Sequence, residues 1–128
     1  MLHAGDHALL TNVAPDVFDN EVDDRLSSEF LRDARHHMAV AIDAGRIIGF
    51  ASGVHYVHPD KPAEMFINEV GVASSHHGRG IGKAIMKTML EHARSIGCVN
   101  AWVLQSDPTR RQWRCTHRLA DERALRMK

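Results

Sequence analysis

Residues 67–97 read INEVGVASSHHGRGIGKAIMKTMLEHARSIG, and this stretch decides the fold of the chain. It opens with β-branched residues, passes through closely spaced glycines and continues into a run whose apolar residues recur every three or four positions. That spacing predicts an amphipathic helix closed by Gly97. The sequence therefore predicts a strand, a glycine-rich loop and a helix in direct succession.

The glycines of this loop, Gly78, Gly80 and Gly82, occupy alternate positions between the predicted strand and helix. Because they have no side chain, they let main-chain N–H groups approach an anion closely, and the N-terminus of the helix adds its positive dipole end. Arg79 and Lys83 add positive charge. The pattern favours a phosphate site, with a tight turn that binds no ligand as the alternative. A Walker loop is disfavoured because no Gly-Lys-Ser/Thr ending follows.

Strands and short helices are predicted around this stretch. The predicted strands are Met38–Ile42, Ile47–Val57, Met65–Val72 and Val99–Leu104, of which the first two form a hairpin. Apolar spacing after Pro15 predicts two short helices, with Asp24 and Ser27 as capping candidates. The predicted class is α+β, with a strand meander followed by one β-α-β crossover. A meander before the glycines disfavours a Rossmann loop.

The same stretch resembles the acetyl-coenzyme A motif of the GCN5-related N-acetyltransferase (GNAT) superfamily. The family motif, Arg/Gln-x-x-Gly-x-Gly/Ala, aligns with His77-x-x-Gly80-x-Gly82, so His77 departs from the usual first residue. The resemblance covers about residues 9–107 of one expected domain spanning residues 1–128. It implies an α/β sandwich, a GNAT-like mixed sheet with helices on both faces, lacking the last strands of the family.

The resemblance also implies that acetyl-coenzyme A is the co-substrate. Its pantetheine arm would be bound by main-chain groups of the strand before the loop, which belong to Val70, Gly71 and Val72. Its pyrophosphate would be held by the loop amides of Arg79, Gly80, Ile81, Gly82 and Lys83.

Glu69 stands directly before Val70, at a strand position where many GNAT relatives carry a carboxylate. In the family a neutral amine attacks the thioester carbonyl, and a base must first remove the ammonium proton. The resemblance makes Glu69 the candidate base, with binding of a cationic substrate as the alternative role.

The implied function is transfer of acetyl to a primary amine of a small molecule. The pattern around Met65–Val72 is similar to the aminoglycoside 3-N-acetyltransferase branch, and an acidic N-terminal region would attract polycationic amines. An acidic face on solvated helices is the alternative reading of those charges.

Composition bounds the class of protein. The chain has 128 residues, 44% of them apolar, which suits a single core. No run approaches the roughly 18 apolar residues that a membrane span needs. The N-terminus carries His3, Asp6 and His7 where a signal peptide would be basic and then apolar, so we expect a cytoplasmic protein without a membrane partner.

Cys98 and Cys115 are too few and too far apart for a disulfide framework or a zinc site.

Ten histidines raise the question of a metal site. The candidate ligands are His36, His37, His55, His58, His76 and His77. Adjacent histidines point in different directions on a regular element, and no His-x-x-x-His face joins an acidic partner. We therefore expect no metal.

The C-terminus is rich in arginine and departs from the family. Residues 108–128 form an atypical tail that raises the alternative of nucleic-acid binding, which we disfavour because Trp113 is its only aromatic residue. Regrouping the codon sets of residues 108–121 by one base permits the reading DTAAMALYTPAGG, which resembles the family helix missing here. We infer, as a hypothesis, that a frameshift near Pro108 produced the tail.

Two expectations follow from this tail. The family tyrosine that protonates the leaving thiolate is absent, since Tyr56 is the only tyrosine, so activity would be impaired. The alternative function is a coenzyme A-binding protein with little or no activity. Loss of the last strands would leave the fourth strand as a sheet edge, which favours a homodimer or a core closed by the tail.

Overall fold

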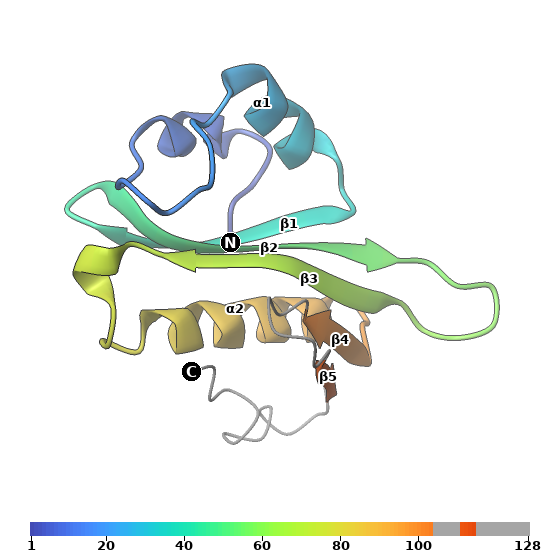
Figure 1. Cartoon of the computed structure of the whole chain (residues 1–128). Coiled ribbons are helices and arrows are strands. Elements are labelled where there is room, and N and C mark those ends of the chain that lie inside the picture. The colour runs from blue at the N-terminus through green and yellow to red at the C-terminus, as the bar shows by residue number, and fades with distance from the viewer. Residues whose placement is uncertain (104–110, 115–128) are drawn as a thin grey trace.

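The computed structural model describes residues 1–103 and, for the main chain alone, residues 111–114. One sheet divides the molecule into two layers (Figure 1). Its strands, in spatial order, are β1 (His36–Asp43), β2 (Arg46–Tyr56), β3 (Glu64–Val72), β4 (Asn100–Val103) and β5 (Arg111–Arg114). All neighbouring strands are antiparallel except β3 and β4, which are parallel.

Helices lie on both faces of this sheet (Figure 1). One face carries the 3-10 helix η1 (Asp6–Thr11) and the helix α1 (Asp24–Arg32), and the other carries α2 (Ile81–Ser95). A short 3-10 helix, η2 (Ser74–His76), follows β3. The hairpin, the third strand and the single crossover through a helix are confirmed, and so is the α+β class. Within the described residues, no helix has the length and apolarity to cross a membrane.

The prediction of two helices after Pro15 is wrong. A single helix, α1, begins at Asp24 because the Asp23 carboxylate accepts a hydrogen bond from the main-chain N–H of Leu26 at 2.8 Å. Ser27 does not cap, since its hydroxyl donates to the Asp23 carbonyl from inside the helix. The other helical turns, η1, lie before Pro15, where no helix was predicted.

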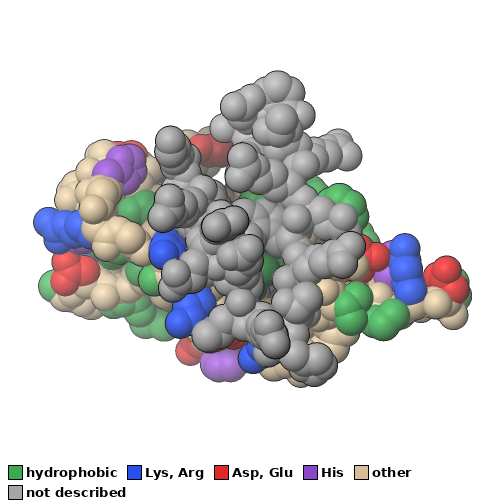
Figure 2. Space-filling model, turned by 90° about the horizontal axis from the view of Figure 1, so that it is seen from below, with side chains coloured by type: hydrophobic (Ala, Val, Ile, Leu, Met, Phe, Trp, Pro, Cys, Tyr) green, Lys and Arg blue, Asp and Glu red, His purple; other side chains and the backbone are tan. Residues whose placement is uncertain are grey.

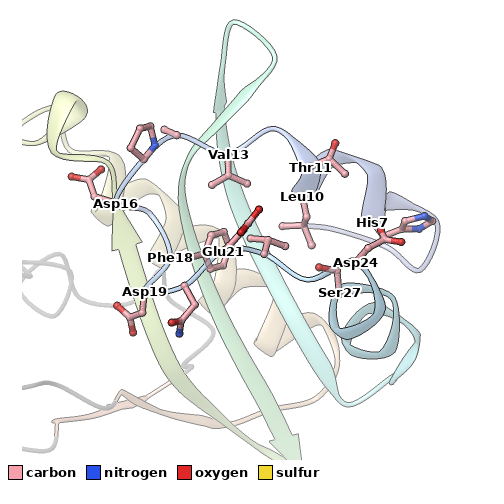
Figure 3. Close-up of a pocket in the computed structure, with 14 residues that line it drawn as sticks. His7, Leu10, Thr11, Val13, Asp16, Phe18, Asp19, Glu21, Asp24 and Ser27 are labelled. Atoms are coloured by element: carbon pink, nitrogen blue, oxygen red, sulfur yellow. The ribbon is translucent and has the colours of Figure 1, made fainter.

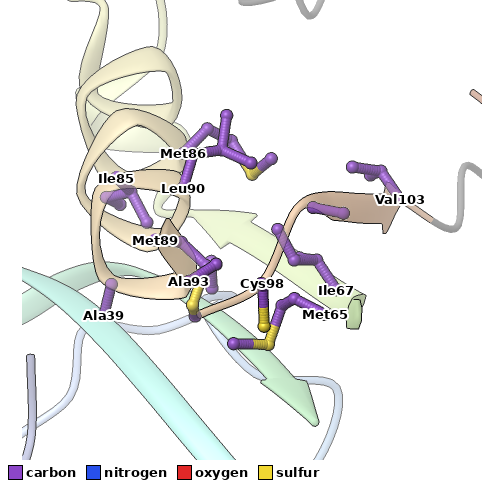
Figure 4. Packing of buried hydrophobic residues seen from close by; sticks show 12 residues of the cluster. Ala39, Met65, Ile67, Ile85, Met86, Met89, Leu90, Ala93, Cys98 and Val103 are labelled. Carbon is purple, nitrogen blue, oxygen red and sulfur yellow. The ribbon is translucent and has the colours of Figure 1, made fainter. Parts of the chain in front are cut away.

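Two hydrophobic clusters hold the layers to the sheet. The cluster on the α2 face (Figure 4) combines helix residues with inward-facing strand residues: Ala39, Ala51, Met65, Ile67, Ile85, Met86, Met89, Leu90, Ala93, Cys98, Ala101 and Val103. Cys98 follows α2 and is a buried, free thiol, whereas Cys115 lies outside the described residues. The cluster on the α1 face contains Leu10, Ala14, Val17, Leu31, Met38, Ile47, Ile48, Phe50 and Ala73.

The loop before α1 packs directly on β3 at Gly71. A Cβ atom on Gly71 would lie 2.5 Å from the carbonyl oxygen of Val17 and 3.0 Å from the Phe50 ring. The next residue of the loop, Phe18, stacks on Phe50 with ring centroids 4.1 Å apart. The missing side chain at Gly71 therefore allows this loop to close against the sheet.

A β-bulge interrupts the pairing of β2 with β3. Ser52 pairs with Glu69 and Gly53 pairs with Ile67, so Asn68 is an extra residue on β3. Before the bulge, Met65 and Ile67 face α2, and after it Val70 and Val72 do so. The extra residue thus moves Glu69 to the α1 face, which simple alternation from Ile67 would not have done.

The described residues include a fifth strand that the sequence did not predict. Arg111–Arg114 pairs antiparallel with Asn100–Val103, so β4 is not the edge of the sheet. The expectation of an open fourth strand is therefore wrong, because part of the tail supplies the missing main-chain partners. The expectation of a homodimer was based on that open edge, so this argument for a homodimer no longer holds.

The close approach at Gly71 predicts a specific loss of stability. Gly71→Ala should lower the free energy of unfolding by about 1–3 kcal/mol, because the new methyl group collides with the Val17 carbonyl. Gly5→Ala is the control, since nothing lies within 4 Å of its Cβ position, and it should change stability by less than about 0.5 kcal/mol. Urea unfolding measures both, and equal midpoints would contradict the packing described.

Candidate functional site

The glycine loop leads into the N-terminus of α2, which no side chain caps. Gly80 is the N-cap residue with φ 76°, a left-handed conformation that other residues rarely adopt, and the first turn contains no acidic side chain. The first N–H groups of the helix are therefore free to bind an anion. The structure brings the residues predicted to hold a pyrophosphate to this end: Arg79, Gly80, Ile81, Gly82 and Lys83.

Charge and space at this end also suit an anion. A Cβ atom on Gly82 would meet only the Val72 side chain, at 3.7 Å, so the fold itself does not require glycine there. Figure 2, which views the molecule from the α2 side, shows Lys and Arg side chains on the half of this face where the glycine loop lies in Figure 1. Among the described residues, positions 79–83 thus combine main-chain amides at a helix N-terminus, room beside Gly82 and positive charge.

The strand before the loop presents main-chain groups on two sides. The Ala73 N–H donates to Ile48 on β2 at 2.8 Å, and hydrogen-bonded and unbonded residues alternate along an antiparallel pair. Gly71 therefore directs its main chain toward β2, whereas Val70 and Val72 direct theirs to the opposite side. Of the three residues predicted to bind a pantetheine arm, Val70 and Val72 are so placed, although the Val72 carbonyl already accepts a hydrogen bond from His77.

His77 closes the loop onto this strand. Its ring donates from Nε2 to the Val72 carbonyl at 2.8 Å. This residue replaces the Arg or Gln of the family motif, and sequence reasoning treated it only as a departure from that motif. The side chain instead bridges the loop and β3. The sequence could have indicated this contact, because a histidine ring at this position carries a nitrogen that can donate a hydrogen bond.

Glu69 lies on the opposite face from α2. It lines a cavity of about 250 Å³ together with residues of the α1 layer, among them Phe18, Asp19, Glu21 and Leu26. The neighbouring bulge residue, Asn68, accepts a hydrogen bond from Ser52 at 3.1 Å. Glu69 is therefore separated from the glycine loop by the sheet, while its neighbour Val70 belongs to the strand segment that leads to that loop.

A larger cavity of about 530 Å³ adjoins the first (Figure 3). The two share lining residues from the segment between η1 and α1, including Phe18, Asp19 and Glu21. The carboxylates that line one cavity or the other are Asp16, Asp19, Glu21, Asp23, Asp24 and Glu69. Among the described residues that line these cavities, none is Lys or Arg. The negative charge favours a cationic ligand.

Three histidines form a hydrogen-bonded chain between the sheet and α2. Nε2 of His92 lies 2.9 Å from Nδ1 of His37, and Nε2 of His37 lies 2.8 Å from Nδ1 of His55. Burial, and then repulsion from His92 and His55, lowers the pKa of His37 to about 4, and burial lowers the pKa of His92 as well. Of the proposed metal ligands, only His37 and His55 meet in this way, and no group in residues 1–103 has three or more side chains placed to hold a metal ion.

Comparison with known proteins assigns the family. A family model described as the acetyltransferase (GNAT) family matches residues 7–119. The chain therefore belongs to the acetyltransferase (GNAT) family.

Relatives and solved structures agree with this assignment. An L-2,4-diaminobutyric acid acetyltransferase of Virgibacillus pantothenticus is 34% identical over 55 residues, covering 43% of this chain and 33% of that protein. A protein of the same name from Nocardia farcinica is 31% identical over 96 residues, covering 73% and 48%. This chain thus spans about a third to a half of their length. The crystal structure of an aminoglycoside acetyltransferase from an uncultured soil metagenomic sample has a TM-score of 0.68 at 21% identity, covering 84% of this chain and 78% of that one, and shows the same fold.

The histidine chain predicts a loss of stability in acid. Because the pKa of His37 is about 4 in the folded protein and 6.5 ordinarily, the unfolded chain binds more protons between these values. The free energy of unfolding should therefore fall as the pH drops from about 6.5 to about 4. In His37→Gln this fall should be shallower, because the amide does not titrate.

Urea midpoints measured between about pH 7.5 and about pH 4.5 test this expectation. His7→Gln is the control, since His7 belongs to η1, on the other face of the sheet from α2. Equal acid dependence in His37→Gln and the unaltered protein would rule out a stabilising neutral His37.

Proposed function

We propose that this protein transfers an acetyl group from acetyl-coenzyme A to a primary amine of a small molecule. The observation that carries the proposal is the uncapped N-terminus of α2 on one face of β3 and the acidic cavities around Glu69 on the other. Membership of the GNAT family supports it. Among the described strands, β4 pairs with β3 only as far as Ile67, so a coenzyme arm along Val70 and Val72 and an amine beside Glu69 would meet at this edge of the sheet.

The coenzyme half would consist of the loop and the open side of β3. The amides of residues 79–83 and the charges of Arg79 and Lys83 suit a pyrophosphate, and the main-chain groups of Val70 and Val72 suit an amide-containing arm. Bound acetyl-coenzyme A would supply the acetyl group as a thioester.

Glu69 would accept a proton on the acceptor side. A protonated amine does not attack a carbonyl, so the carboxylate takes the ammonium proton and frees the lone pair. The amine nitrogen then bonds to the acetyl carbon, the carbon–sulfur bond breaks, and the second proton that the nitrogen loses passes through solvent to the leaving thiolate. Tyr56, the only tyrosine, ends β2 and is 47% exposed, so it does not replace the family tyrosine as an acid beside the coenzyme half.

The acceptor we favour is a small molecule with more than one positive charge. The cavities around Glu69 carry several carboxylates from the segment between η1 and α1. Relatives and structural neighbours are named for a diamino acid and for aminoglycosides, which share this chemistry. An aminoglycoside is therefore one candidate acceptor, and 2,4-diaminobutyric acid is another.

Coenzyme binding is tested first at the loop. Acetyl-coenzyme A should raise the melting temperature of the unaltered protein, because it binds only the folded state. Gly82→Val should remove most of this rise while leaving the melting temperature without ligand almost unchanged, since its Cβ has room in the fold. Thr88→Val, further along α2, is the control. Full stabilisation of Gly82→Val would exclude the loop as the phosphate site.

The role of Glu69 is tested by removing its charge. Glu69→Gln should keep the thermal stabilisation by acetyl-coenzyme A while lowering amine-dependent thiol release by about ten-fold or more. A fall in kcat indicates a base, and a rise in the KM for the amine alone indicates charge pairing. Suitable acceptors are an aminoglycoside and 2,4-diaminobutyric acid.

Glu91→Gln is the matched control, because Glu91 is exposed on α2. Equal turnover in Glu69→Gln and the unaltered protein would remove Glu69 from the mechanism. Stabilisation by acetyl-coenzyme A without turnover of any amine would instead support the alternative function, a coenzyme A-binding protein with little or no activity.

A further inference from the structure

The segment that joins β3 to α2 is exposed and combines the short 3-10 helix η2 with side-chain contacts to other parts of the chain. Residues 74–80 are exposed except for the partly buried His76. His76 bonds through Nε2 to the Asp43 carboxylate at 2.9 Å, from the turn between β1 and β2. Ser74 bonds to Asp16, which is 58 residues away in the sequence. The conformation of this segment therefore depends on a few long-range contacts.

The contact between Asp16 and Ser74 is the most elaborate of these. Both the main-chain N–H and the hydroxyl of Ser74 donate to the Asp16 carboxylate, the N–H lying 3.3 Å from Oδ2. Figure 3 shows Asp16 on the cavity-lining loop, beside the segment that follows β3. A charged acceptor strengthens such bonds relative to a neutral one.

Asp16 is itself held rigidly. Ala14 donates to the Ile47 carbonyl at 2.8 Å on one side, and Val17 is buried against Gly71 on the other. Between them Asp16 adopts φ 62°, a left-handed conformation that is uncommon outside glycine, asparagine and aspartate. With the chain held on both sides, this backbone conformation directs the Asp16 carboxylate toward Ser74.

The sheet does not need this contact to end β3. Ala73 is 1% exposed and its N–H already bonds to Ile48 at 2.8 Å. Ser74 is the first exposed residue after it, so Asp16 acts at the point where the chain leaves the sheet and turns toward the glycine loop. Asp16 also lines the larger cavity, so one residue touches both halves of the proposed site.

We propose that Asp16 is a positioning residue that fixes the start of the pyrophosphate loop through Ser74. This inference rests on the proposed function. Holding Ser74 limits the conformations of residues 74–80 before the ligand arrives, which lowers the entropy lost on binding. Asp16 touches neither the thioester nor the amine, and it acts through the main chain of the loop.

The test uses three variants of the full chain. Asp16→Gly keeps the left-handed backbone and removes the carboxylate, whereas Asp16→Asn keeps both the backbone preference and an acceptor oxygen. Ser74→Ala removes the hydroxyl partner at an exposed position that the fold tolerates. The readouts are the Kd for acetyl-coenzyme A, urea unfolding, and amide hydrogen exchange of residues 74–80 without ligand.

Asp16→Gly should raise the Kd by about ten-fold and speed exchange in residues 74–80, in line with the loss of hydrogen bonds to a charged acceptor. Asp16→Asn should stay within about three-fold of the unaltered protein, since it restores an acceptor. Asp16→Gly and Ser74→Ala should be non-additive, because the hydroxyl bond that Ser74→Ala removes is one of the bonds that Asp16→Gly removes.

Two outcomes separate this inference from the proposed function. If acetyl-coenzyme A binds the unaltered protein and Asp16→Gly equally well, the inference is overturned and the proposed function stands. If acetyl-coenzyme A does not bind the unaltered protein, the proposed function fails and the inference fails with it. A weakened Kd in Asp16→Gly with unchanged amide exchange in residues 74–80 also overturns the inference, because the carboxylate would then not act through this segment.

Discussion

One extra residue in β3 sets the arrangement on which the site depends. The bulge at Asn68 reverses the facing of every residue after it, so Val70 and Val72 pack toward α2 while Glu69 faces the α1 layer. In an uninterrupted strand Glu69 would follow Ile67 into the α2 core, where an unpaired carboxylate is costly. The bulge thus turns the charged Glu69 and the apolar side chain of the next residue, Val70, to opposite faces of the sheet.

The acidic cavities that we propose as the acceptor side are lined mostly by chain with little regular structure. Between η1 and α1 the loop is fixed by the missing side chain of Gly71, by the stacking of Phe18 on Phe50 and by the bond from Ala14 to Ile47. Most of the cavity-lining carboxylates lie on this loop or at the start of α1. Their positions therefore depend on three packing contacts with the sheet and hardly at all on helix or strand geometry.

Local patterns predicted the elements well and their contacts poorly. Periodicity is a property of neighbouring residues, so the strands, α2 and the glycine loop could be read from the sequence. The bulge left no trace, because Asn68 and Glu69 are both polar and alternation cannot show which of them is extra. The first of the two helices expected after Pro15 is instead a loop, because its packing against Gly71 outweighed the helix propensity of the residues. The partnership of Asp16 with Ser74 spans 58 residues, a distance that no local pattern reports.

The chain of imidazoles has a consequence beyond its effect on stability. A neutral ring carries one N–H and one bare nitrogen, and both nitrogens of His37 are engaged, by His92 and by His55. His37 must therefore accept a hydrogen bond from one neighbour and donate one to the other. The hydrogen bonds of the chain then all run in one direction, and two tautomeric states are possible, one for each direction. Reversing that direction requires all three rings to change tautomer together, so the tautomers of His92 on α2, His37 on β1 and His55 on β2 are coupled.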